Sequence, residues 1–150
     1  MTPNEATARQ AELSLIAQTM VATNVAPETI EALSPDDFAD ARHGMIWRHI
    51  GDEVRGGADD APSLAIIERM QTAGELDLGG GFEYVESFNL WGMSRNHTPL
   101  AHCIEVIKQC ARLRRIAATA KAAADAADGY DESSTAALVA LRRALDDVEE

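Results

Sequence analysis

The sequence has few cysteines and no long apolar run, and these two absences exclude several classes of protein. Only two of its 150 residues are cysteines, Cys103 and Cys110, which is too few for the disulfide framework of a small secreted domain. No stretch approaches the roughly eighteen consecutive apolar residues of a membrane-spanning helix. The first ten residues, MTPNEATARQ, lack the basic start and apolar segment of a signal peptide. We therefore expect a cytoplasmic protein without membrane contact.

Aromatic and basic residues are also scarce. Aromatic side chains make up 5% of the chain and hydrophobic residues 46%, so one domain core can form, but it must be mainly aliphatic. Thirteen basic residues stand against twenty-five acidic ones, and the resulting net charge of -12 repels phosphate. Direct binding of nucleic acid by this chain is therefore not expected. Alanine is abundant and β-branched residues are few, which favours helices over sheet.

Cap signals and apolar spacing predict a succession of helices. We take Asn4 as the N-cap of the first helix, Ser34 as the N-cap of a helix that ends at Gly56, and Ser63 as the cap of the next. Residues 89–97, between the last short helix and the long helix, are predicted to form a loop in which Trp91 folds back onto the core. The expected helices cover residues 5–20, 27–33, 35–55, 63–74, 82–88, about 98–127 and about 135–148.

The predicted fold class is all-α, with a compact head over residues 1–97 and an antiparallel helical hairpin over residues 98–150. The last helix carries apolar residues at spacings of three and four, which is typical of a coiled-coil seam. These residues are Leu138, Leu141, Leu145 and Val148. Eight of the eleven residues from Ala117 to Ala127 are alanine, so another helix can approach closely there. Because a lone hairpin leaves this seam exposed, we predict that it mediates self-association.

Motifs that carry chemistry are missing. There is no GxxxxGK[ST] phosphate loop and no GxSxG elbow, and Gly79–Gly81 reads as a turn. His97, His102, Cys103 and Cys110 lack the spacing of a metal site, so we interpret the cysteines as packed apolar side chains. We expect no catalytic residue, no metal and no cofactor in this chain.

One alternative is a general acid/base site formed by His43 and His49 with the nearby acids Asp36, Asp37 and Asp40. Acidic residues at a helix start also complement the helix dipole, and this structural interpretation is favoured.

Basic residues concentrate in the predicted long helix. Lys108, Arg112, Arg114, Arg115 and Lys121 lie within fourteen positions of one another. They either form a solvated face paired with Glu105 or with the acidic last helix, or they contact an acidic partner surface or a neighbouring subunit. For the second possibility we name Lys108, Arg112, Arg114 and Arg115 as partner-binding residues.

The order of these segments resembles the N-terminal domain of bacterial replicative DNA helicases, the DnaB family. The resemblance rests on short segments that follow one another along almost the whole chain. They are residues 8–13 (ARQAEL), 33–38 (LSPDDF), 43–50 (HGMIWRHI), Asp60 with Ser63–Leu64, 74–76 (GEL), 80–85 (GGFEYV) and 107–116 (IKQCARLRRI).

This resemblance implies a helical head followed by a hairpin and no ATPase site in this chain, since ATP and Mg belong to a downstream motor domain. It further implies a collar built from dimers or a trimer of dimers, with primase or a helicase loader docked on it during DNA replication in the primosome. An alternative is a free-standing adaptor of phage or plasmid type that binds or inhibits a replicative helicase. A third, less favoured, is a small enzyme that uses the His43 and His49 region.

Overall fold

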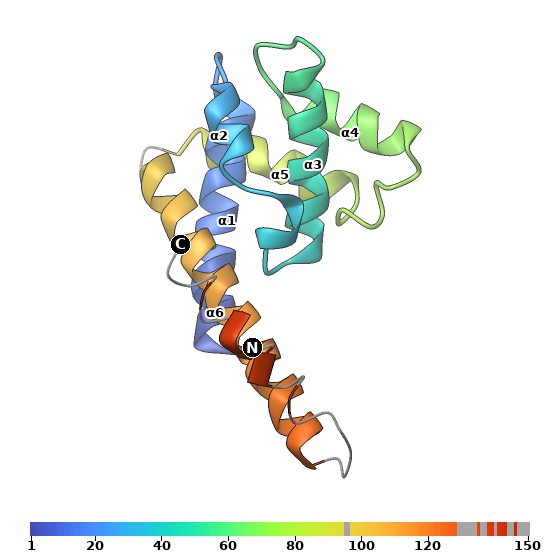
Figure 1. Cartoon of the computed structure of the whole chain (residues 1–150). Coiled ribbons are helices and arrows are strands. Elements are labelled where there is room, and N and C mark those ends of the chain that lie inside the picture. The colour runs from blue at the N-terminus through green and yellow to red at the C-terminus, as the bar shows by residue number, and fades with distance from the viewer. Residues whose placement is uncertain (95–96, 129–134, 136–137, 140, 144–145, 147–150) are drawn as a thin grey trace. The chain divides into compact units, whose positions relative to one another are not determined.

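The computed structural model describes residues 1–94, 97–128, 135, 138–139, 141–143 and 146, and within them helices are the only regular secondary structure (Figure 1). The predicted all-α class is confirmed. In chain order the helices are α1 (Pro3–Val21), α2 (Pro27–Glu31), the 3-10 helix η1 (Pro35–Asp37), α3 (Ala41–Arg55), α4 (Ser63–Thr72), α5 (Phe82–Gly92) and α6 (Leu100–Asp128). Among the described residues, no helix is long and apolar enough to cross a membrane.

The chain divides into two compact units, Met1–Lys108 and Gln109–Glu150. The first unit contains α1 to α5 and the first turns of α6, and the second contains the rest of α6 and the helical residues described after it. The predicted boundary at residue 98 lies earlier, just before the first turn of α6.

The start of α1 differs from the prediction. Thr2, not Asn4, is the N-cap, and its side chain accepts the backbone N–H of Glu5 at 3.1 Å. The Glu5 carboxylate in turn accepts the backbone N–H of Thr2 at 3.0 Å, which completes a capping box. Because Pro3 has no backbone N–H to satisfy, it fits the first position of the helix, and Asn4 lies one residue inside.

The single helix expected from residue 35 to residue 55 is two elements. Ser34 does start a helix, but η1 ends after one turn at Asp37, and Asp40 caps a separate helix, α3. Gly44 allows the two elements to pack closely, because a Cβ at this position would overlap the carbonyl oxygen of Pro35. The chain therefore bends between η1 and α3.

Two details of α4 and α5 also depart from the sequence prediction. Helix α4 starts at Ser63 with Pro62 as its N-cap, so Ser63 is the first residue of the helix and not its cap. Helix α5 continues to Gly92, so the first part of the expected loop is helical. Trp91 contacts Phe88 but is 43% exposed, and the prediction that it folds onto the core is wrong.

The core of the first unit lies between α1, α3, α4 and α5, with Cys103 and Ile107 of α6 joining it. Helix α1 packs along α5, and α4 packs on both α3 and α5. The aromatic part of the core is small, as the composition predicts. It consists of Trp47 and Phe38 with ring centroids 5.6 Å apart, and of the fully buried Phe88.

Candidate functional site

Three helices of the first unit meet at a buried polar cluster centred on His43. This residue lies in the first turn of α3 and its side chain is 1% exposed. Its Nδ1 is 2.9 Å from Oε1 of Glu12 on α1, and its Nε2 is 2.5 Å from the hydroxyl of Tyr84 on α5. Both ring nitrogens therefore have a protein partner, one on each neighbouring helix.

Glu12 is fully buried and satisfies three donors at once. Its two carboxylate oxygens accept the backbone N–H groups of Ala39 at 2.8 Å and Asp40 at 3.2 Å, next to the His43 ring. These N–H groups precede the first turn of α3, where no helical carbonyl is available to them. Since a carboxylate only accepts, the proton of a neutral His43 is assigned to Nδ1, and Nε2 then accepts the Tyr84 O–H.

Asp40 extends the cluster toward the surface. It caps α3 by accepting the backbone N–H of Arg42 at 3.0 Å, and it accepts two bonds from the Arg42 guanidinium, at 3.1 and 2.7 Å. Burial alone would raise the pKa of Asp40, but the Arg42 hydrogen bonds and the nearby His43 outweigh it and lower the pKa to about 2. The same guanidinium lies 4.3 Å from the centre of the Tyr84 ring, a cation–π contact.

This geometry bears on the acid/base hypothesis. His43 and Glu12 are buried and already paired, so neither presents a proton acceptor to a substrate. Asp36 and Asp37 lie on η1, and His49 belongs to a different cluster. Of the residues that the hypothesis groups together, only His43 and Asp40 lie in one cluster, and this cluster joins α1, α3 and α5.

His49 faces α4 and the turn that follows it. Its side chain is 5% exposed, and its Nε2 lies 3.5 Å from Oε1 of Glu75, to which Arg48 also donates. Burial lowers the pKa of His49, and the charge of Arg48 adds to this effect, while Glu75 opposes it. The lowered pKa favours the neutral form of the His49 imidazole, which lies beside a surface ion pair.

Both cysteines are free and buried. Cys103 is 0% exposed, and burial raises the pKa of its thiol, which disfavours a reactive thiolate. Across the described parts of the chain, no three His, Cys, Asp or Glu side chains are placed to hold a metal ion.

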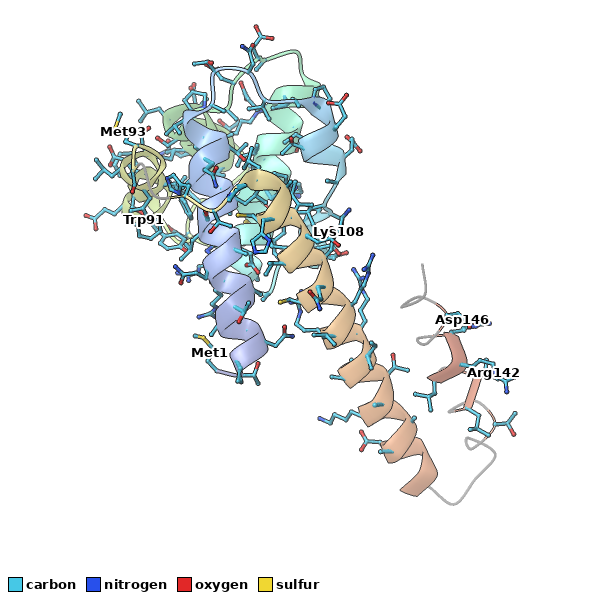
Figure 2. All side chains as sticks on the ribbon, turned by 90° about the vertical axis from the view of Figure 1, so that its left-hand side faces the viewer. Met1, Trp91, Met93, Lys108, Arg142 and Asp146 are labelled. Atoms are coloured by element: carbon cyan, nitrogen blue, oxygen red, sulfur yellow. The ribbon has the colours of Figure 1, made fainter. Side chains whose placement is uncertain are left out.

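The predicted partner-binding residues all lie on α6. Lys108 is the last residue of the first unit (Figure 2), and the three arginines belong to the second. Lys108, Arg112 and Arg114 are half-buried and Arg115 is exposed. Their role in binding stays a prediction.

Two of the four predicted self-association residues can be placed. Leu138 is 68% exposed and Leu141 is half-buried, and both are helical. Leu145 and Val148 lie outside the described residues. A leucine exposed to this extent fits the predicted apolar seam, but no contact across it is described.

Comparison with known families decides the affiliation of the chain. The family model of the DnaB-like helicase N terminal domain matches residues 4–109. The chain belongs to this family. The matched residues correspond closely to the first compact unit, Met1–Lys108, so the match covers the residues of the His43 cluster and the core around it.

A solved structure shows the same fold. The chain is similar to the crystal structure of the N-terminal domain of DnaB helicase from Mycobacterium tuberculosis, with a TM-score of 0.76 and 18% sequence identity. The match covers 91% of this chain and 96% of that one, so the likeness extends beyond the first unit. No curated protein matches the chain in a sequence search.

The sequence prediction overlooked Glu12 and Tyr84, although the signal for Glu12 was present. Glu12 lies four residues after Ala8 and four before Ile16, on the apolar face of α1. An acid in that position predicts a buried partner, because an unpaired buried charge is costly.

We predict that Glu12→Ala destabilises this DnaB-family domain strongly. The change leaves two backbone N–H groups and the His43 Nδ1 without their acceptor in a buried position, at an expected cost of about 3–5 kcal/mol. Glu12→Gln keeps an oxygen acceptor and should cost roughly half as much. Urea unfolding followed by circular dichroism measures both, and a loss below about 1 kcal/mol for Glu12→Ala would contradict a central role for the cluster.

We also predict an acid-dependent contribution from Asp40. Its folded-state pKa of about 2 lies below the ordinary value of 3.8, so its ionised form stabilises the fold above pH 4. This contribution disappears as the pH falls from about 4 to 2. Asp40→Asn keeps the capping oxygen but cannot titrate. The difference in unfolding free energy between wild type and Asp40→Asn should therefore shrink over this interval, and a constant difference would refute the assignment.

Proposed function

We propose that this chain is the non-catalytic N-terminal collar domain of a DnaB-like replicative helicase and acts in DNA replication in the cytoplasm. The observation that carries the proposal is the family match over residues 4–109, and the likeness to the solved DnaB N-terminal domain supports it. In this proposal ATP and Mg are used by a motor domain of the parent helicase. The domain itself contributes assembly and docking.

For assembly we propose the apolar residues of the last helix, Leu138, Leu141, Leu145 and Val148. Leu138 is 68% exposed, so this segment presents an apolar side chain that association with other copies would cover. The proposed product is a dimer, or a trimer of dimers. The four residues follow the family-matched segment, so a defect there should spare the head.

For docking we propose the basic segment of α6, with primase or a helicase loader as the partner. The rest of the chain is strongly acidic, and this segment holds five of its thirteen basic residues. A concentration of one charge sign on an otherwise opposite surface is suited to recognising an acidic partner.

The assembly proposal predicts that Leu141→Asp weakens self-association before it affects the head. A carboxylate in an apolar seam costs several kcal/mol, so we expect the dissociation constant to rise by at least about a hundredfold. Light scattering of the chain from micromolar to several hundred micromolar, together with circular dichroism, measures mass and folding.

Val139→Asp is the matched control, since it adds the same charge two residues earlier and off the predicted seam. We expect it to associate like wild type. A wild-type chain that stays monomeric over the whole range, or a Leu141→Asp chain of unchanged mass, would contradict the assembly proposal.

The docking proposal predicts that reversing the charge of Arg112 and Arg115 weakens binding of the cognate primase C-terminal domain by about tenfold or more. Isothermal titration calorimetry at low salt measures the affinity. Arg55→Glu on α3 is the control, because Arg55 is 53% exposed but lies outside the segment. Equal affinities for the double variant and the control would remove the basic segment as the docking surface.

A further inference from the structure

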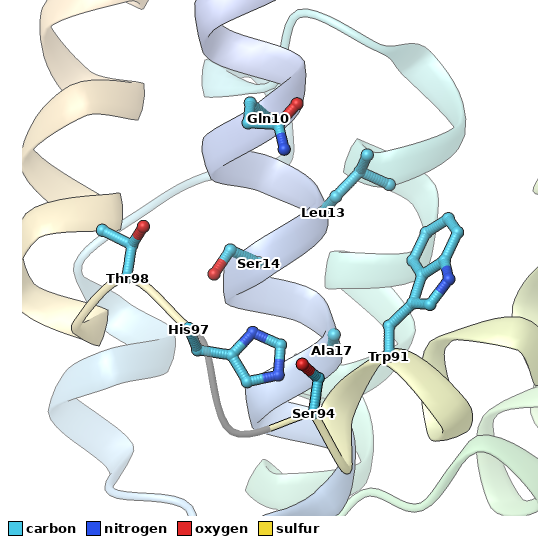
Figure 3. A pocket seen from close by; sticks show the side chains of 8 residues that line it. All are labelled: Gln10, Leu13, Ser14, Ala17, Trp91, Ser94, His97 and Thr98. Carbon is cyan, nitrogen blue, oxygen red and sulfur yellow. The ribbon is translucent and has the colours of Figure 1, made fainter.

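The first unit has a pocket that none of the proposed functions uses. It has a volume of about 350 Å³ and lies between α1, the end of α5 and the residues just before α6 (Figure 3). We call it the Trp91 pocket. Its lining residues are Gln10, Leu13, Ser14, Ala17, Trp91, Ser94, His97 and Thr98.

Trp91 is a fixed wall of this pocket. Its ring meets the buried Phe88 edge to face, with centroids 5.4 Å apart and planes at 80°. The next residue, Gly92, lies against α1 so closely that a Cβ would overlap the carbonyl oxygen of Ala17. The end of α5 is therefore held on α1, and the 43% of Trp91 that is exposed is presented in a defined orientation.

Exposed apolar residues flank Trp91 in the sequence, and an exposed acidic residue precedes them in α5. Leu90 and Met93, which flank Trp91 in sequence, are 73% and 71% exposed, and Figure 2 shows Trp91 and Met93 at the same end of the first unit. Glu86 is exposed and lies four residues before Leu90, on the same face of α5. Large apolar side chains that gather in this way are typical of a binding surface.

The side chains that line the pocket are suited to an uncharged group. Among the described residues that line it there is no Asp, Glu, Lys or Arg, although residues 1–94 carry sixteen acidic and five basic residues. Trp91 and Leu13 supply apolar surface, and Gln10 supplies an amide. His97 adds an imidazole ring to the lining, and its buried Nε2 atom has no hydrogen-bond partner among the described residues. A flat ring with one polar edge satisfies all of these features.

The surroundings favour a chain segment over a free small molecule. A second hollow of about 410 Å³ adjoins the pocket along α1 and shares Gln10 and Thr98 with it. An occupant that fills both must extend along α1, and the acidic head around it attracts positive charge.

We propose that the Trp91 pocket binds an aromatic side chain presented by a basic segment of a partner protein. The proposal rests on the docking role proposed above, but places a second contact on the head, on residues different from the basic segment of α6. An aromatic anchor in a pocket, surrounded by apolar contacts that exclude water, is the arrangement that concentrates binding energy in protein interfaces.

Nuclear magnetic resonance of the ¹⁵N-labelled full chain tests this with three short peptides. One has a tyrosine between two pairs of lysines, one has alanine in place of the tyrosine, and one has glutamates in place of the lysines. We expect the lysine–tyrosine peptide to shift the Trp91 indole N–H and the Gln10 amide saturably. The other two should bind at least about tenfold more weakly.

Matched variants separate the pocket from general attraction. Trp91→Ala and Gln10→Lys should each weaken the lysine–tyrosine peptide by about tenfold, the first by removing the wall and the second by charge repulsion. Leu64→Ala and Gln71→Lys change exposed residues of α4, outside the pocket, and should bind like wild type. Gln10 is exposed, so its variant keeps the test valid even if Trp91→Ala is unstable.

The proposal is overturned if the tyrosine peptide causes no saturable shift at Trp91, or if the alanine peptide binds equally well, which would show charge attraction alone. Failure here leaves the mass measurements on Leu141→Asp and the primase titrations on Arg112 and Arg115 unaffected, so the two proposals can fail separately.

Discussion

The head of this domain depends on one buried carboxylate. Glu12 on α1 accepts the two backbone N–H groups that lead into α3 and faces the His43 ring, which in turn reaches Tyr84 on α5. Hydrophobic contacts between helices tolerate sliding and rotation, whereas a hydrogen bond to a buried charge does not. The cluster therefore fixes how α1, α3 and α5 are aligned with one another. The aliphatic core stabilises their association but is less directional.

The position of this cluster explains why a histidine, a carboxylate and a tyrosine in close contact do not indicate catalysis here. A catalytic acid or base needs a donor or acceptor atom that can reach a substrate. Both ring nitrogens of His43 are instead hydrogen-bonded within the protein. The surfaces that remain available are of a different kind. They are exposed apolar side chains at Trp91 and Leu138 and the basic segment of α6, and all of them are suited to protein contacts.

The helical content of the fold could be predicted because caps and apolar spacing are local signals. The stripe Ile46, Trp47 and Ile50 lies in the core as its spacing indicates, and α6 extends to within a residue of its expected end. Local signals failed where two of them competed. Ser34 and Asp40 are both good N-caps, and the structure uses both, Ser34 for η1 and Asp40 for α3, with Gly44 packed against the carbonyl oxygen of Pro35.

The remaining misses have tertiary causes. Whether Trp91 is covered depends on the path of the chain after α5, which no periodicity encodes. The partners of Glu12 lie 27 to 31 positions away, and Tyr84 is a further 41 positions beyond His43. Sequence shows that an acid stands on an apolar face, but the identity of its partner is a property of the folded chain.

These separations have a consequence for synthesis on the ribosome. Helix α1 emerges before the other helices described, yet its main packing partner is α5, and Glu12 acquires its hydrogen-bond donors only after residues 39–43 have followed. Domains acquire stable structure as units, and long-range contacts form late. Until residues 39–43 are available, α1 therefore carries an unpaired carboxylate on its apolar face. Burying this unpaired charge would be costly, so Glu12 disfavours burial of the apolar face of α1 until its hydrogen-bond donors are present.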